Sequence, residues 1–197
     1  MNKKIRASIQ FLIIIIPLAF LSCAEIVVGS AAKVATAQQE ERSLGEMVDD
    51  TVLKAVIKNT YFDTNEKIFF NVDVEVSQGR VLLTGTVESS DLRIEATRLA
   101  WNAKGVKTVI NEIQINNDDS ILNYADDLVI ATKIAGKFVL DDDIQSLNYN
   151  IEVVNKNVYL IGIARDEQER EKAIRISKEV FGVEEVIDYI ILSQSKE

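Results

Sequence analysis

The sequence predicts an α+β protein built from two tandem αββαβ units, each a small three-stranded sheet packed against two helices. Two observations carry this prediction: an internal repeat, and the same order of helical and alternating apolar patterns in both copies. Shifting the chain by 77 positions (152 − 75) places Glu75 on Glu152 without a gap, and it places Gly105 on Gly182. Many other positions match at this offset, so the two halves are a duplication.

Each unit is expected to begin with a helix. Its apolar positions recur every four residues in both copies, so they form one stripe that faces a core. Aspartate pairs at Asp49-Asp50 and Asp126-Asp127 are expected to start these helices, where a carboxylate caps the helix and complements its dipole. The stripe consists of Leu53, Ile57 and Tyr61 in copy one and of Ile130, Ile134 and Phe138 in copy two.

Two strands follow the first helix in each copy. Alternating apolar residues predict strands over 72–76 and 149–153, and further strands over 81–87 and 158–164. The turns between them contain residues that tolerate positive φ: Gln78-Gly79-Arg80 and Asn155-Lys156-Asn157.

A second helix and a last strand complete each unit. Ser89 and Asp166 are predicted N-caps of the second helices, and Gly105 and Gly182 suit the left-handed residue that ends a helix. The last strands are expected at 108–115 and 185–192.

Glycines inside two predicted strands indicate a close backbone contact. Gly85 and Gly162 occupy matching positions in the second strand of each copy, where glycine marks a bulge or tight packing.

The N-terminal segment has the pattern of an export signal. Lys3, Lys4 and Arg6 precede an apolar run over 11–21, which is too short to span a bilayer and is followed by Cys23. A cysteine behind such a run resembles the bacterial lipobox, in which the thiol is lipidated. The expected organisation is a signal peptide (1–22), a lipidated N-terminus and tether (23–45), and two domains (46–116 and 121–193).

Composition excludes several functional classes. The sequence has no histidine and one cysteine, which removes histidine-dependent catalysis, intrachain disulfides and multi-cysteine zinc sites. The net charge is −9, so a nucleic-acid partner is not expected. No cofactor, metal or enzymatic activity is expected. Asp49-Asp50 could do acid–base chemistry and Asp141–Asp143 could attract a cation, but helix capping and a solvated turn explain these carboxylates.

The element order, the strand glycines and the Gly-Val-x-x-Val segments at Gly105 and Gly182 resemble the BON domain. That family is linked to phospholipid binding. Two copies behind a lipobox are similar to the dual-BON lipoproteins of Gram-negative bacteria, which are outer-membrane- and division-localised, bind phospholipid and support envelope integrity. The resemblance implies a lipid-anchored protein of the outer membrane, acylated at Cys23 with palmitate-type chains and facing the periplasm.

The resemblance also implies a lipid site on the first helix of the second domain. Thr132-Lys133 matches the family pattern, whereas Val129 stands where the family has an aromatic residue. The spacing of four independently places Val129, Lys133 and Lys137 on one face, with Gly136 and Leu140 nearby. Anionic phospholipid and a solvated lysine face are both open interpretations of this helix.

An envelope protein partner is the alternative to lipid. Trp101 lies off the repeated apolar stripe, and its counterpart in copy two is Lys178. An exposed tryptophan can anchor a partner, although packing between the two domains would also explain it.

Overall fold

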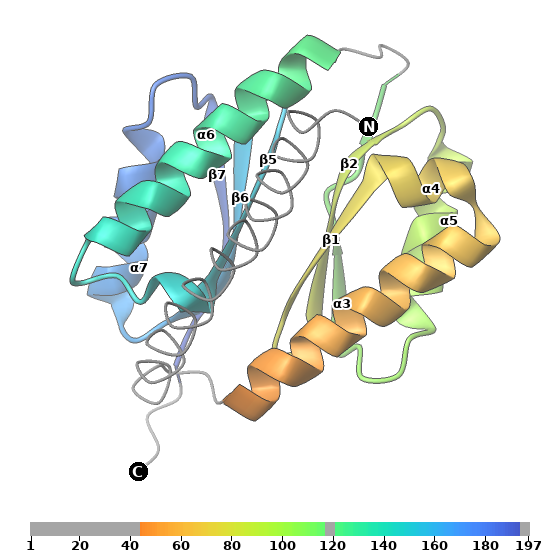
Figure 1. Ribbon diagram of the computed structural model, residues 1–197, viewed down its shortest axis with the longest axis horizontal. Coiled ribbons are helices and arrows are strands. Elements are labelled where there is room, and N and C mark those ends of the chain that lie inside the picture. Colours follow the sequence, from red (N-terminus) through yellow and green to blue (C-terminus); the bar gives the residue numbers. More distant parts are fainter. Residues whose placement is uncertain (1–43, 117–120, 194–197) are drawn as a thin grey trace, which may run out of the picture. The chain divides into compact units, whose positions relative to one another are not determined.

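The computed structural model describes residues 44–116 and 121–193, which form two copies of the predicted αββαβ unit (Figure 1). The predicted signal peptide, Cys23 and nearly all of the predicted tether lie outside the described residues. Within the described part, no helix combines the length and the apolar character needed to cross a membrane.

The first repeat contains one more helix than the pattern predicts. Its elements are α3 (Leu44–Thr64), α4 (Glu66–Asn71), β1 (Val72–Ser77), β2 (Arg80–Val87), α5 (Ser90–Trp101), β3 (Thr108–Asn111) and β4 (Gln114–Ile115). β2 lies in the middle of the sheet, antiparallel to β1 and parallel to β3 and β4.

The second repeat has the same topology. Its elements are α6 (Ile121–Leu140), the 3₁₀ turn η4 (Ser146–Asn148), β5 (Tyr149–Val154), β6 (Asn157–Ala164), α7 (Glu167–Lys178) and β7 (Glu185–Leu192). β6 is the central strand, antiparallel to β5 and parallel to β7.

The predicted N-caps of the second helices are confirmed, whereas each helix ends four residues before its predicted terminal glycine. The Ser89 side chain accepts a hydrogen bond from the Leu92 amide at the start of α5, and Asp166 does the same for α7. Gly105 and Gly182 follow these helices with φ of 107° and 99°, in the region that glycine adopts at least cost.

The predicted role of the aspartate pairs is wrong. The helices begin earlier, at Leu44 and Ile121, so Asp50 and Asp127 are buried within the first helices rather than capping them. Each carboxylate instead accepts two hydrogen bonds from backbone amides of the β-turn in its own repeat. The bonds run to Asp50 from Gln78 (2.7 Å) and Gly79 (2.9 Å), and to Asp127 from Asn155 and Lys156 (2.7 Å each).

Two further features of repeat one differ from the prediction. The six-residue α4 begins where the Asn65 side chain accepts hydrogen bonds from the amides of Lys67 and Ile68. The last strand is interrupted between β3 and β4, because the Asn111 side chain binds the Ile113 amide and the Ile113 side chain turns into the core. At the break between β3 and β4, local side-chain hydrogen bonding prevails over the alternation of apolar residues.

The close approach predicted at the strand glycines is confirmed. A Cβ atom on Gly85 would lie 2.2 Å from the Asn71 carbonyl oxygen, and one on Gly162 would lie 2.3 Å from that of Asn148. The backbone that leads into the first strand of each sheet therefore passes directly against a position that only glycine fills.

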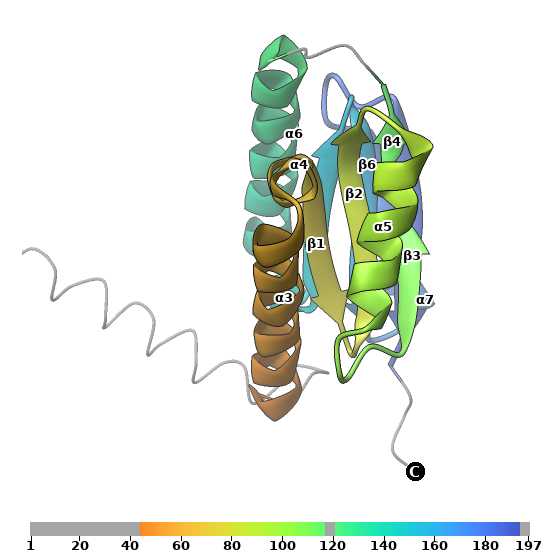
Figure 2. The ribbon, with the colours of Figure 1, turned by 90° about the vertical axis from the view of Figure 1, so that its right-hand side faces the viewer.

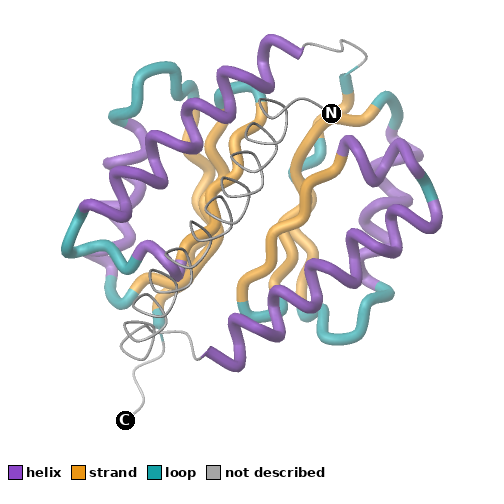
Figure 3. The backbone as a smooth tube through the Cα atoms, in the orientation of Figure 1, coloured by secondary structure: helices purple, strands orange, loops and turns teal. Residues whose placement is uncertain are grey.

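Each sheet has one face covered by the helices of its own repeat (Figures 1 and 3). In repeat one, Val74 and Leu83 point into a core with α3 and α5. In repeat two, Leu160 points into a core with α6 and α7. Figure 2 shows α5 lying along β2 and β3.

The opposite faces of the two sheets pack against each other. Alternate residues on these faces form a third hydrophobic cluster that contains members of both repeats: Leu82, Ile110, Val154, Tyr159, Ile161, Ile187 and Tyr189. Because helices cover the other faces, residues 44–116 and 121–193 form four layers: helices, sheet, sheet and helices.

Candidate lipid-binding helix and adjacent groove

Helix α6 presents the predicted candidate residues on its solvent side. Ile130, Ile134 and Phe138 are buried against the sheet. The six candidates, none of them buried, are Val129, Thr132, Lys133, Gly136, Lys137 and Leu140. They therefore form one continuous surface, which we call the α6 outer face. Its apolar members include Val129, which is 51% exposed, and Leu140, which is 84% exposed.

The two lysines of the α6 outer face are not neutralised within the described part of the chain. Lys133 and Lys137 are exposed, and neither forms an ion pair or a side-chain hydrogen bond with a described residue. A Cβ atom on Gly136 would meet nothing within 4 Å, so a flat surface could approach the helix between the lysines. The arrangement offers two cationic groups beside exposed apolar side chains.

Acidic residues near the ends of α6 are largely engaged elsewhere. Asp127 turns inward to the β-turn, as described above. The ammonium of Lys172 on α7 donates to Asp141 (2.6 Å) and Asp143 (2.7 Å). Its bond to Asp141, together with one from the Asp143 backbone amide, holds the pKa of the Asp141 carboxyl below its ordinary value. An ammonium thus occupies the position that a cation would take in this acidic turn.

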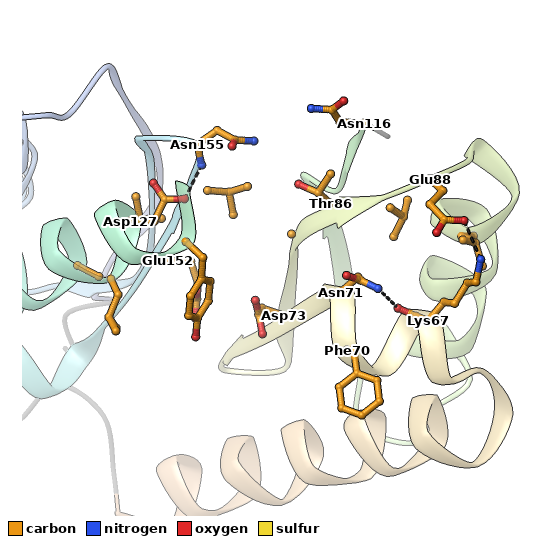
Figure 4. Close-up of a pocket in the computed structure, with 18 residues that line it drawn as sticks. Lys67, Phe70, Asn71, Asp73, Thr86, Glu88, Asn116, Asp127, Glu152 and Asn155 are labelled. Atoms are coloured by element: carbon orange, nitrogen blue, oxygen red, sulfur yellow. Dashed lines mark hydrogen bonds and ion pairs between the residues drawn. The ribbon is translucent and has the colours of Figure 1, made fainter. Parts of the chain in front are cut away.

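A groove of about 610 Å³ lies beside α6, between the two repeats (Figure 4). One wall comes from Tyr124, Leu128 and Ala131 of α6 together with the end of β5. The other wall comes from α4, β1 and β2, with Phe70 at the rim.

The charged lining of the groove is mainly acidic. Lys67 pairs with Glu88 (2.7 Å), while Asp73 and Asp127 add carboxylates from opposite walls. An anionic headgroup would therefore be repelled by the groove and attracted by the lysines of the α6 outer face. The two surfaces share α6 but differ in charge.

Carboxyl groups from equivalent positions meet at the contact between the repeats. Glu152 of β5 lies beside Glu75 of β1, its counterpart in the duplication, and Lys54 of α3 forms an ion pair with Glu75. Burial raises the pKa of the Glu152 carboxyl to about 8, and its hydrogen bond with Glu75 and repulsion by that group act in the same direction. Glu152 is therefore protonated at neutral pH, which avoids placing two charges together.

A second pair of equivalent positions also meets at this contact. The hydroxyl of Tyr189 donates to the carboxylate of Glu112, and the two residues are 77 positions apart. Two amide hydrogen bonds accompany this pair, from Asn150 to the Val76 carbonyl (3.1 Å) and from Asn155 to the Gln114 side chain (2.7 Å). Residues that contact their own counterparts indicate a pseudo-twofold contact, as in an isologous dimer.

Trp101 does not belong to the contact between the repeats. Its side chain is 49% exposed and lies outside all three hydrophobic clusters. The sequence left open whether Trp101 anchors a partner or packs between the two domains. Its exposed position disfavours packing between the domains.

Sequence reasoning did not identify the groove or the residues at the contact between the repeats. The duplication did place Glu75 on Glu152 and Glu112 on Tyr189. Alternation also put these side chains on the strand faces away from the helices. An acidic residue repeated on such a face was a usable signal for polar contact between the copies.

The fold and the duplication agree with comparisons to known proteins. The BON domain matches the chain twice, over residues 49–117 and 126–194. The chain belongs to the BON-domain family. A relative in Anaplasma centrale, named only for its place in the gshII 5′ region, is 43% identical over 150 residues, covering 76% of this chain and 98% of its own.

Two other relatives in the BON-domain family have more informative names. The outer membrane lipoprotein DolP of Haemophilus influenzae is 29% identical over 166 residues, which are 84% of this chain and 86% of DolP. The osmotically-inducible protein Y of Escherichia coli is 28% identical over 145 residues, which are 73% of this chain and 72% of that protein.

Proposed function

We propose that this BON-domain protein is a lipoprotein of the outer membrane, anchored through Cys23 and facing the periplasm. In this proposal the α6 outer face binds anionic phospholipid and so supports the integrity of the envelope. The observation that carries the proposal is the exposed pair Lys133 and Lys137, which have no ion-pair partner among the described residues. The export-signal pattern and the similarity to DolP support the location.

The two lysines supply part of the affinity for an anionic surface, and apolar contact supplies the rest. A lysine near an anionic bilayer contributes about 1 kcal/mol, so two contribute about 2 kcal/mol, or roughly thirtyfold in affinity. A lipid anchor would hold the domains near the bilayer, where weak contacts act at high effective concentration. Shallow burial of Val129 and Leu140 would add to the electrostatic attraction.

The surroundings of the α6 outer face favour this role despite a net charge of −9 for the chain. Of the aspartates near the ends of α6, Asp127, Asp141 and Asp143 are held by hydrogen bonds or ion pairs. Asp126 and Asp142 remain exposed on the flanks of the helix. The repulsion that the sequence suggests is therefore reduced in the folded protein.

The proposal is tested by sedimentation with vesicles of neutral or anionic phospholipid. Residues 24–197 suffice, because every hydrophobic cluster of the described fold lies between Leu53 and Ile190. We expect the protein to sediment with anionic vesicles and to be released by salt, because screening weakens the attraction. Lys133→Glu/Lys137→Glu should abolish sedimentation.

A control variant separates the α6 outer face from overall charge. Lys104→Glu/Lys107→Glu changes the net charge by the same amount in repeat one and should sediment like the wild-type protein. Equal losses in both variants would show that only net charge matters. No sedimentation of the folded wild-type protein would reject headgroup binding and would leave the protein-interaction alternative.

A further inference from the structure

Helix α5 carries an exposed stripe that its counterpart in repeat two lacks. Ile94, Arg98 and Trp101 are spaced by four and three residues, so they share one face of the helix. Ile94 is 63% exposed and Trp101 49%, and Arg98 is also exposed. We call these three residues the α5 stripe. The matching residues of α7 are Glu171, Arg175 and Lys178, which form an ordinary charged surface.

The end of α5 is also basic within an acidic protein. Residues 96–111 contain no acidic residue and have three basic ones, for a net charge of +3, whereas residues 173–188 have two basic and four acidic residues, for a net charge of −2. The basic residues are Arg98, Lys104 and Lys107, all exposed and without a side-chain ion pair to a described residue. Asp91 is the exposed acidic residue at the opposite end of α5.

The stripe faces away from the proposed membrane surface. α5 packs on the sheet of repeat one and α6 on the sheet of repeat two, and both sheets lie between these helices. A bilayer that contacts the α6 outer face would therefore leave the α5 stripe open to the other side. Tryptophan and arginine are the residue types most enriched where proteins bind each other tightly.

We infer that the α5 stripe docks an acidic, amphipathic segment of another protein, with Trp101 and Ile94 contacting its apolar side chains and Arg98 contacting a carboxylate. The positive charge of the surface selects a negatively charged partner. The net charge of −9 on each chain disfavours a second copy as the occupant. Lys104 and Lys107 extend the positive surface beyond the helix end.

Trp101 is the only tryptophan of the sequence, so its fluorescence reports on this surface directly. The probe is a synthetic amphipathic helix built from leucine and glutamate, compared with the same peptide carrying lysine in place of glutamate. We expect the acidic peptide to shift the emission to shorter wavelength in a saturable manner, and the lysine peptide to cause no shift. Arg98→Glu should weaken the binding at least tenfold.

Arg175→Glu in α7 is the matched control, because it makes the same charge change at the equivalent position. It should leave the affinity for the acidic peptide unchanged. The inference is overturned if the acidic peptide causes no shift, if both peptides cause the same shift, or if Arg98→Glu has no effect.

Two further outcomes would assign the surface to another occupant and also overturn the inference. A shift with anionic vesicles that Arg98→Glu removes would make the stripe a membrane contact. A shift that grows with protein concentration alone, together with a larger species in sedimentation velocity, would make it a contact between copies. Neither outcome depends on Lys133 or Lys137, so this test is independent of the proposed lipid site.

Discussion

The two repeats share a core but differ on their exposed helices. On the first helices, the pair Lys133 and Lys137 of α6 corresponds to Val56 and Thr60 of α3. On the second helices the difference is reversed, since Trp101 of α5 corresponds to Lys178 of α7. The buried stripes remain apolar in both copies. Duplication thus preserved the residues that the fold requires and allowed one helix in each repeat to acquire its own surface.

The contact between the repeats shows how far the symmetry extends. Leu82 and Tyr159 occupy equivalent positions and both lie in the shared cluster. Glu112 and Tyr189 are also equivalent, but one is an acceptor and the other a donor. The contact is therefore complementary rather than strictly symmetric at this position.

The largest effect is expected at the strand glycines. Gly85→Ala should lower the free energy of unfolding by about 3–4 kcal/mol, because its Cβ would clash with the Asn71 carbonyl and its φ is 105°. Gly162→Ala should cost about 2 kcal/mol, from the clash alone. Urea unfolding measures both values. Gly136→Ala, in open space on α6, should be neutral or stabilising.

These three alanine variants test whether the close backbone approach at the strand glycine stabilises both repeats, with Gly136 as the control. If the free energy of unfolding fell less for Gly85→Ala than for Gly162→Ala, the positive φ of Gly85 would not add to the cost of its clash. If Gly136→Ala lowered the free energy of unfolding as much as the other two variants, the losses could not be assigned to the clash of the added Cβ atom with a backbone carbonyl.

The next effect concerns the buried aspartates. Asp50→Ala and Asp127→Ala should each lower the free energy of unfolding by about 2–3 kcal/mol, because two backbone amides lose a charged acceptor. The two losses should agree closely, since the geometry is the same in both repeats. Thermal unfolding of the two variants checks the values. Asp49→Ala, at the exposed neighbouring position, should cost little; if it matched Asp50→Ala, the turn-binding role would be refuted.

A further effect is expected from pH at the contact between the repeats, and over a single pH unit it is smaller than the losses above. Glu152 has a pKa of about 8 in the folded protein, above the ordinary value of about 4.3 for an unfolded chain. The folded state therefore holds more protons between these values, so the stability from this group is complete below pH 4 and is lost as the pH rises through 8. Its slope is at most about 1.4 kcal/mol per pH unit.

Glu152→Gln should remove this slope and make the protein more stable than wild type at pH 8. Chemical unfolding at a series of pH values measures it, with Glu88→Gln as the control at an exposed carboxylate paired with Lys67. Glu75, Asp73 and Lys54 also face Glu152 and stay unchanged in both variants. A slope that persists in Glu152→Gln would assign the pH dependence to other groups.

The sequence was sufficient to predict the fold and to identify the residues of the α6 outer face. A constant offset and periodic apolar residues defined the strands of both sheets except for the break between β3 and β4, and N-cap chemistry located the starts of the second helices. The 77-residue offset between the repeats did not reveal α4, because this helix occurs only in repeat one, where Asn65 caps it. Periodicity could not show that Asp50 bonds to a turn 28 residues away, because that contact exists only in the folded chain.

For the candidate site, spacing identified Lys133 and Lys137 as neighbours on an exposed face. It could not show that Lys172 of another helix neutralises Asp141 and Asp143. The groove likewise requires both repeats to be in contact. Long-range pairing of side chains is therefore the part of the site that needed a structure.

The most direct test of the account exchanges the residues that distinguish α6 from α3. Lys133→Val/Lys137→Thr gives α6 the side chains of α3, and Val56→Lys/Thr60→Lys does the reverse. Affinity for anionic vesicles, measured by sedimentation at constant salt, should fall roughly thirtyfold in the first variant and should not fall in the second. An unchanged affinity of the first variant, with its fold intact, would contradict the claim that the α6 outer face binds anionic phospholipid.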